Sequence, residues 1–234
     1  INVQCGSTYL EPLRALVAEC GADVGIAHDG DADRVMLMDS EGNEIDGDMV
    51  EAVCAIDLKQ RGLLAGDTAV STVMANLGLT HALRDAGINL IQTKVGDRYV
   101  LEAMREGGYV IGGEQSGHTI FLEHNSTGDG LVTALQFLAA CKRAGKSAGE
   151  AAKAMTRFPQ TLINVRVKDK HAADGNQAIA DAVAAAEAAL GEDGRVLLRP
   201  SGTEPVVRVM VEAMDEQAAE QHAKAIAEVV EREI

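Results

Sequence analysis

The spacing of apolar residues predicts an alternation of strands and helices through the middle of the chain. Short β-branched runs are typical of buried strands, and apolar positions three or four residues apart indicate helices. Between residues 68 and 145 the two patterns alternate, which is typical of β-α units in an α/β sheet. The expected strands cover residues 68–73, 88–92 and 109–112, and the expected helices cover residues 81–86, 99–106 and 129–144.

The region before residue 68 has fewer elements. Its pattern predicts a helix over residues 11–20, strands over 24–27 and 35–39, a turn at 40–43 and a helix over 49–61. The last helix places Met49, Val53 and Ile56 on one stripe, so it could join two domains.

The pattern changes again after Phe158 and Pro159. We expect a strand over residues 162–168, a helix over 178–190, strands over 195–199 and 206–212, and a helix over 215–232. This β-α-β-β-α order is typical of a separate small α+β domain. The sequence therefore predicts an α/β fold with mixed sheets followed by a small α+β domain, in segments 1–48, 49–158 and 159–234.

Composition and charge narrow the classes of partner. Apolar residues make up 47% of the chain, but no stretch approaches the roughly 18 apolar residues of a membrane span, so we expect a cytoplasmic protein. Twenty-one basic residues stand against 36 acidic ones, which argues against nucleic acid or a membrane as a partner. The excess of acidic residues is greatest in residues 1–48, with 11 acidic and 2 basic residues, and this density of negative charge favours the binding of a cation.

An acidic motif follows the expected strand at residues 24–27. Asp29, Asp31 and Asp33 alternate with small residues and precede Arg34. Three carboxylates at the end of a strand repel one another unless a divalent cation joins them, and an all-oxygen set suits Mg²⁺. An EF-hand would need Gly and Glu where Arg34 and Ser40 stand, and a haloacid dehalogenase motif would need Thr or Val in place of Asp33. The alternative is a solvated acidic turn.

A second motif joins the last two expected strands. Ser and Thr hydroxyls, a glycine that frees backbone amides and two arginines are the groups that bind an anion. The residues are Arg199, Ser201, Gly202, Thr203 and Arg208. The spacing does not fit a Walker loop, and a plain hairpin loop is the alternative.

Two further motifs follow expected strands. Paired glycines at 112 and 113 precede Glu114, Ser116 and His118, which suits a substrate rich in hydroxyl groups. A charged loop over residues 93–98 contains Asp97 and Arg98. Either loop could also be purely structural.

The four motifs in this order, DGDADR, TKVGDRYV, GGEQSGH and RPSGTEPVVR, resemble those of the α-D-phosphohexomutase family over essentially the whole chain. The resemblance implies that Asp29, Asp31 and Asp33 ligate Mg²⁺, with Arg34 near the transferring phosphoryl group and His118 near the reacting end of the sugar. It also implies that the substrate is held by Asp97, Arg98, Glu114, Ser116, Arg199, Ser201, Gly202, Thr203 and Arg208. Ala32 stands where the family more often has Gly.

The resemblance implies a phosphoryl transfer through a bisphosphate intermediate. The segments INVQCGST, GEQSGH and RPSGTEP are most similar to family members that act on hexosamine phosphates, which would make the partner a small hexosamine phosphate. Members acting on mannose or glucose phosphates, and a non-catalytic sugar-phosphate-binding module, stay open as alternatives.

One family feature is absent from the 234 residues, namely the phosphorylated serine of a T/S-A-S-H-N-P segment. We therefore expect a C-terminal portion of such an enzyme: the end of its second domain, its third domain and its fourth. This portion should be inactive alone and should have an exposed sheet edge in residues 1–48. The resemblance also implies that the intact protein forms a homodimer.

Overall fold

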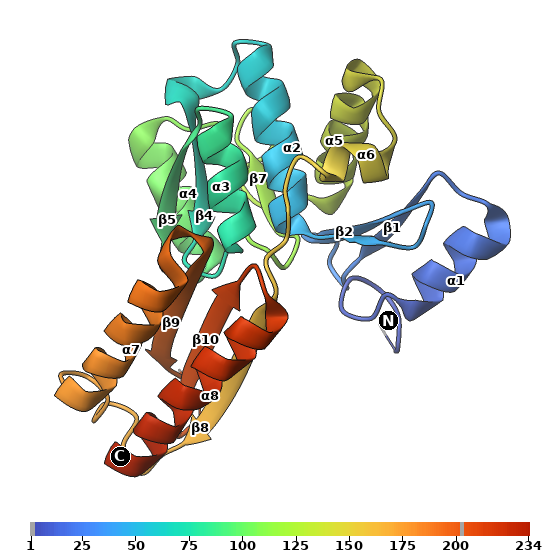
Figure 1. Ribbon diagram of the computed structural model, residues 1–234. Coiled ribbons are helices and arrows are strands. Elements are labelled where there is room, and N and C mark those ends of the chain that lie inside the picture. The colour runs from blue at the N-terminus through green and yellow to red at the C-terminus, as the bar shows by residue number, and fades with distance from the viewer. Residues whose placement is uncertain (1–2, 202–203) are drawn as a thin grey trace. The chain divides into compact units, whose positions relative to one another are not determined.

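The computed structural model describes residues 3–201 and 204–234, and it divides into two compact units at Thr156 and Arg157. Figure 1 labels the elements of both units.

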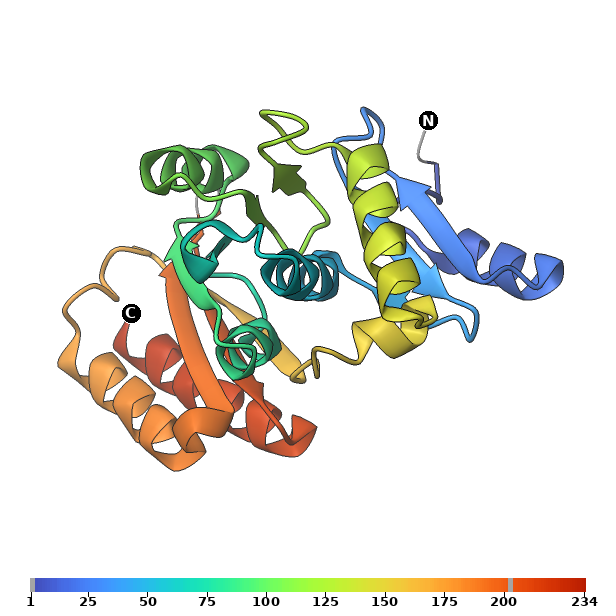
Figure 2. The same ribbon diagram turned by 90° about the horizontal axis from the view of Figure 1, so that it is seen from above.

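The first unit begins with a small antiparallel sheet. Its strand order is β1-β2-β3, formed by Val24–His28, Val35–Asp39 and Glu44–Ile45. Helix α1, Glu11–Cys20, packs so closely on one face that a Cβ at Gly25 would lie 2.6 Å from Val17. Helices α5, Gly130–Ala144, and α6, Ala148–Ala152, contact β2, and α5 runs beside the blue strands in Figure 2.

The second sheet of this unit has the order β5-β4-β6-β7. Strands β4 (Thr68–Thr72), β5 (Asn89–Thr93) and β6 (Ile111–Gly113) are parallel, and β7 (Thr119–Phe121) is antiparallel to β6. A 3-10 turn, Ala65–Asp67, precedes β4, and helices α3 (Leu77–Asp85) and α4 (Asp97–Gly107) connect the strands. Helix α2, Gly47–Gln60, is the central element, because it contacts β6, α3, α5 and α6 and most of its side chains are buried.

The second unit is a three-stranded antiparallel sheet with two helices. The strand order is β8-β10-β9, formed by Gln160–Arg166, Val206–Ala213 and Gly194–Pro200. Helices α7, Gln177–Leu190, and α8, Glu216–Glu233, lie on one face of the sheet (Figure 1), and a 3-10 turn, Gly191–Asp193, leads from α7 into β9. Buried Val207, Val209 and Val211 of β10 point toward these helices.

The predicted fold class is confirmed: mixed α/β sheets are followed by a small α+β unit. The pattern missed the short strands β3 and β7 and began α3 four residues late. The leucines of α5 do not mark its buried face: Leu131 and Leu135 are 61% and 58% exposed, and Ala134 and Phe137 are buried instead. No helix in the described part of the chain is long and apolar enough to cross a membrane.

Candidate functional site

The acidic loop lies between β1 and β2, where the chain turns sharply. Ala32 has a φ of 59°, and its carbonyl accepts a hydrogen bond of 2.9 Å from the Gly130 amide at the start of α5. The turn brings Asp29, Asp31 and Asp33 together, so that one carboxylate oxygen from each lies within 4.8 Å of the other two. The structure therefore brings all three sequence-predicted ligands to one place.

The protonation of these carboxyl groups reflects their mutual repulsion. Burial and the neighbouring charges of Asp29 and Asp31 raise the pKa of Asp33. Burial raises the pKa of Asp29 too, but hydrogen bonds, above all from the Arg34 backbone amide at 3.2 Å, outweigh it and leave this pKa lowered. One oxygen of Asp33, Oδ1, is buried without a hydrogen-bond partner among the described residues. An oxygen-rich set with an unsatisfied buried ligand atom fits a divalent cation.

The glycine-rich turn between β6 and β7 meets this loop. Arg34 and His118 form an isolated antiparallel β-bridge, and the Val35 amide donates to the Gly117 carbonyl at 3.1 Å. This backbone pairing places His118 Nε2 at 3.6 Å from Asp33 Oδ2. The His118 ring is almost fully buried, so this pairing fixes the imidazole where the two loops meet.

The loop before α4 reaches the same place. Asp97 Oδ2 lies 4.0 Å from His118 Nε2, and the Gly96 amide donates to Glu114 Oε1 at 3.1 Å. Arg98 does not share this environment: its Nε pairs with Glu102 on the same helix at 3.7 Å, and its guanidinium lies over the Tyr99 ring. Of the two residues predicted in this loop, Asp97 joins the cluster and Arg98 makes contacts along α4 instead.

Ser116 is exposed at the tip of the glycine-rich turn. Glu114 is half-buried beneath it, with one oxygen held by Gly96. The first unit thus collects acidic, imidazole and hydroxyl side chains from three loops, each of which follows or precedes a strand.

The second unit contains the basic motif. Arg199 on β9 and Arg208 on β10 are directly opposite in the strand register, which places two positive side chains on one face of the sheet. Burial, and after it the charge of Arg208, lower the pKa of Arg199. Arg208 Nε is buried without a hydrogen-bond partner among the described residues, although its Nη2 contacts Glu204 at 3.3 Å.

Ser201 follows β9 directly and is buried. Its amide donates to the Val206 carbonyl at 2.9 Å, and its Oγ accepts from the Glu204 amide at 3.3 Å. Lys170 donates to the Ser201 carbonyl at 2.6 Å. Gly202 and Thr203, the other predicted members of this loop, lie outside the described residues.

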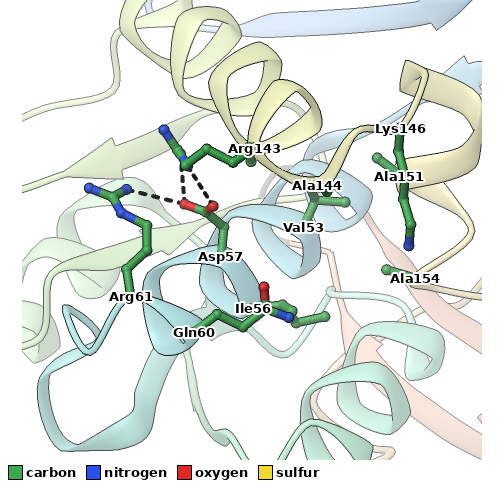
Figure 3. Close-up of a pocket in the computed structure, with 11 residues that line it drawn as sticks. Val53, Ile56, Asp57, Gln60, Arg61, Arg143, Ala144, Lys146, Ala151 and Ala154 are labelled. Atoms are coloured by element: carbon green, nitrogen blue, oxygen red, sulfur yellow. Dashed lines mark hydrogen bonds and ion pairs between the residues drawn. The ribbon is translucent and has the colours of Figure 1, made fainter.

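A cavity of about 200 Å³ between α2, α5 and α6 is a different feature (Figure 3). Asp57 lies at its centre and accepts from Arg143 at 2.7 Å through both oxygens and from Arg61 at 3.2 Å. Because these charges already satisfy one another, Asp57, Arg143 and Arg61 form a structural cluster of ion pairs. None of the residues that line it belongs to the four motifs.

Two glycines that shape the acidic site, Gly128 and Gly130, were not predicted from the sequence. The Gly128 amide donates to His118 Nε2 at 3.2 Å, and a Cβ at this position would lie 2.4 Å from the His118 ring. A Cβ at Gly130 would lie 2.5 Å from the Arg34 carbonyl. The available signal was the pair of glycines around Asp129, which caps α5 through a hydrogen bond to the Val132 amide.

Comparisons with known proteins agree with this arrangement. The profile of phosphoglucomutase/phosphomannomutase alpha/beta/alpha domain III matches residues 46–158, and that of the C-terminal domain of the same family matches residues 162–229. The chain therefore belongs to the phosphoglucomutase/phosphomannomutase family, whose members are phosphohexomutases.

Similar curated proteins include phosphoglucosamine mutases. The one from Frankia alni is 58% identical over 98% of this chain and 50% of its own length. The one from Thermoanaerobacter sp. (strain X514) is 54% identical over 100% of this chain and 53% of its own length. The chain thus spans about half the length of the curated relatives it matches.

Solved structures share the fold. The Aspergillus fumigatus N-acetylphosphoglucosamine mutase, crystallised with GlcNAc-6P and magnesium, matches with a TM-score of 0.80 and 21% identity over 98% of this chain and 57% of its own. A Burkholderia thailandensis family protein matches with a TM-score of 0.77 and 23% identity over 97% of this chain and 50% of its own.

Proposed function

We propose that this chain supplies the cation-, sugar- and phosphate-binding residues of a mutase that interconverts the 6-phosphate and 1-phosphate of a hexosamine. The observation that carries the proposal is the meeting of the acidic loop with the glycine-rich turn, where His118 lies 3.6 Å from Asp33. Phosphoryl transfer needs a cation and a proton-transfer group side by side, and residues for both lie where these two loops meet.

Asp29, Asp31 and Asp33 would hold Mg²⁺. One oxygen atom of each lies within 4.8 Å of the other two, and the buried Oδ1 of Asp33 has no hydrogen-bond partner among the described residues. The bound ion would offset the negative charge of a phosphoryl group.

The chain's own residues would do the rest at this end of the substrate. Arg34 is tied to the loop through its backbone, and its guanidinium lies 3.9 Å from both Asp29 and Asp33, so it can contact a phosphoryl oxygen beside the cation. His118 would exchange a proton with the reacting sugar hydroxyl, and the Gly128 amide, which donates to its Nε2 at 3.2 Å, would hold its ring in place.

The sugar and its second phosphate would use the other motifs. Glu114 and Ser116 would accept or donate hydrogen bonds to sugar hydroxyls, with Arg98 at the margin. Arg199, Arg208 and Ser201, together with Gly202 and Thr203, would bind the phosphate that does not react. Two facing arginines with little internal compensation suit a dianion.

The choice of a hexosamine is supported by the 54–58% identity to curated phosphoglucosamine mutases. The phosphorylated serine expected for the family is not among these 234 residues. We therefore expect the chain to bind its substrate without turning it over.

Calorimetric titration of the 234-residue chain tests the proposal. Glucosamine 6-phosphate should bind in the presence of Mg²⁺, more tightly than glucose 6-phosphate or mannose 6-phosphate, and no glucosamine 1-phosphate should form. Tighter binding of glucose or mannose 6-phosphate would assign a different sugar. Absence of binding for all three sugar phosphates would refute the proposal, and turnover by the chain would refute the assignment of a missing nucleophile.

A further inference from the structure

A glutamate that the four motifs do not include lies beneath the glycine-rich turn, residues 112–118. Glu51, in the second turn of α2, is 0% exposed, and neither of its carboxyl oxygens has a hydrogen-bond partner of normal geometry among the described residues. A buried polar group without partners costs stability, so such a group calls for an explanation.

The surroundings of Glu51 belong to the turn. A Cβ on Gly113 would lie 3.3 Å from Glu51 Oε2, and the Ser71 hydroxyl donates to the Gly113 carbonyl at 3.0 Å. One turn earlier on α2, the Gly47 amide donates to the Gln115 carbonyl at 3.1 Å, and a Cβ there would lie 2.1 Å from the Glu114 carbonyl. The start of α2 is therefore the floor on which the turn rests.

The charges around Glu51 favour its neutral form. Burial raises the pKa of Glu51 well above its usual range, repulsion from Asp48 raises it further, and the Ser71 hydroxyl offsets this in part. Asp48 accepts a 2.7 Å hydrogen bond from the Asn76 amide. The other titratable group near Glu51 on α2 is the Cys54 thiol, and β4 and β6 have no charged residue.

We propose that Glu51 is a positioning residue for the turn that carries Glu114, Ser116 and His118. Its carboxyl group fills the space under Gly113 and gives the Ser71–Gly113 contact a polar neighbour, which fixes the backbone between Gly113 and Gly117. A side chain of similar size without polar atoms would pack there with a lower free-energy cost of burial, but it would leave the turn less constrained. The consequence for sugar binding rests on the proposed function, whereas the consequence for the turn does not.

The experiment compares E51M and E51Q in the 234-residue chain. Hydrogen exchange of the Glu114 and Gly117 amides, which bond to the His118 and Glu114 carbonyls at 2.9 and 3.0 Å, reports on the turn. For E51M we expect a higher Tm, because the unpartnered acid is gone, together with exchange about tenfold faster at these two amides. We also expect about tenfold weaker binding of glucosamine 6-phosphate. E51Q keeps a neutral polar group of the same shape and should restore both exchange and affinity.

The matched control is E212M. Glu212 on β10 is also 0% exposed, but it pairs with Arg195 at 2.8 Å, so its loss should lower Tm and leave exchange at Glu114 and Gly117 unchanged. Unchanged exchange and affinity in E51M would overturn the proposal and leave Glu51 a tolerated core residue.

Two further arms keep the test decisive. If E51M does not fold, E51L replaces it, because leucine also removes both carboxyl oxygens; faster exchange supports the proposal and unchanged exchange overturns it. If the unaltered chain does not bind glucosamine 6-phosphate, the proposed function fails and the exchange measurement alone decides the role of Glu51.

Discussion

Each unit has a charged pair that is satisfied within the unit. In the first unit Asp57 accepts two hydrogen bonds of 2.7 Å from Arg143. In the second unit Glu212 accepts from Arg195 at 2.8 Å. Oppositely charged groups at these distances satisfy each other, so these pairs contribute to stability and offer little to a ligand.

Each unit also has a set of like charges gathered in one place. The first unit has Asp29, Asp31 and Asp33, with the Arg34 guanidinium 3.9 Å from the nearest carboxylate oxygens, and the second has Arg199 directly opposite Arg208. Like charges held together destabilise the fold until a counter-charge arrives. Charges with a partner therefore mark structure, whereas converging like charges mark the candidate binding sites, one for a cation and one for an anion.

Removal of the three aspartates should have the strongest effect, and it tests whether the acidic loop binds a cation. In D29N/D31N/D33N the carboxylate ligands are gone, so Mg²⁺ affinity should fall at least about 100-fold. The Tm without metal should rise, because the repulsion is gone as well. Calorimetric titration with MgCl₂ and thermal unfolding in EDTA measure the two effects. If the triple variant binds Mg²⁺ as the unaltered chain does, the acidic loop is not the cation site.

The second effect tests the anion half. R208M removes one of two facing arginines, so the affinity for glucosamine 6-phosphate should fall about 10- to 100-fold, as expected for the loss of charge-assisted hydrogen bonds. Its Tm should stay level or rise, because a repulsive pair has been broken. R166M, on the exposed end of β8, is the matched control and should bind as before. Equal losses in both variants would point to general electrostatic attraction.

A smaller effect concerns the satisfied pairs. Burial raises the pKa of Asp57, but hydrogen bonds from Arg143 and Arg61 outweigh it and hold this pKa below its usual value. A lowered pKa in the folded state stabilises the protein above the unfolded pKa of about 4, and this contribution is lost as the pH falls through the folded value. D57N should therefore lower stability by about 1 kcal/mol at pH 7, and the difference should shrink below about pH 4.

Thermal unfolding of D57N and the unaltered chain between pH 3 and pH 8 measures this difference. Binding of glucosamine 6-phosphate should not change, because Asp57 is already satisfied by arginines. If D57N lost binding but kept its stability, Asp57 would belong to a binding site and not to a structural ion pair.

The sequence pattern predicted the elements that have a clear period and failed where an element is short. The helix at residues 11–20 and the strand at residues 35–39 match the structure residue for residue. Strand β7 has three residues and follows a turn directly, so it offered no alternation to detect. On α5 large side chains were a poor guide, because the buried face uses Ala134 and Ala140 at close helix contacts and leaves Leu131 exposed.

The candidate site was predictable as far as residue types alone define chemistry. The aspartates converge because they follow a strand in one tight turn, and the turn with His118 joins them through backbone pairing that no motif encodes. For Arg98 the residue type was not enough. It lies one residue after Asp97 and extends along α4, where it pairs with Glu102. Glu51 was missed because one acid in an apolar helix resembles a solvated position until the helix proves buried on all sides.

Backbone strain at Ala32 in the acidic loop should have the least influence on stability. Ala32 adopts a φ of 59°, where a Cβ crowds the backbone, and its carbonyl is held by the Gly130 amide at 2.9 Å. A left-handed conformation costs a residue other than glycine about 1 kcal/mol or more, and glycine gives part of this back through greater freedom when unfolded. A32G should therefore stabilise the chain by about 0.5 to 1 kcal/mol.

The matched control is A22G, at a loop position outside the left-handed region, where added freedom in the unfolded state should lower stability slightly. Thermal unfolding in EDTA compares the two variants without a cation. Because the strain lies between Asp31 and Asp33, relief of the strain should leave Mg²⁺ affinity unchanged if the loop is already in its binding conformation. A large gain in affinity would show instead that the loop moves on binding, so that its converging charges are brought together in part by the ion.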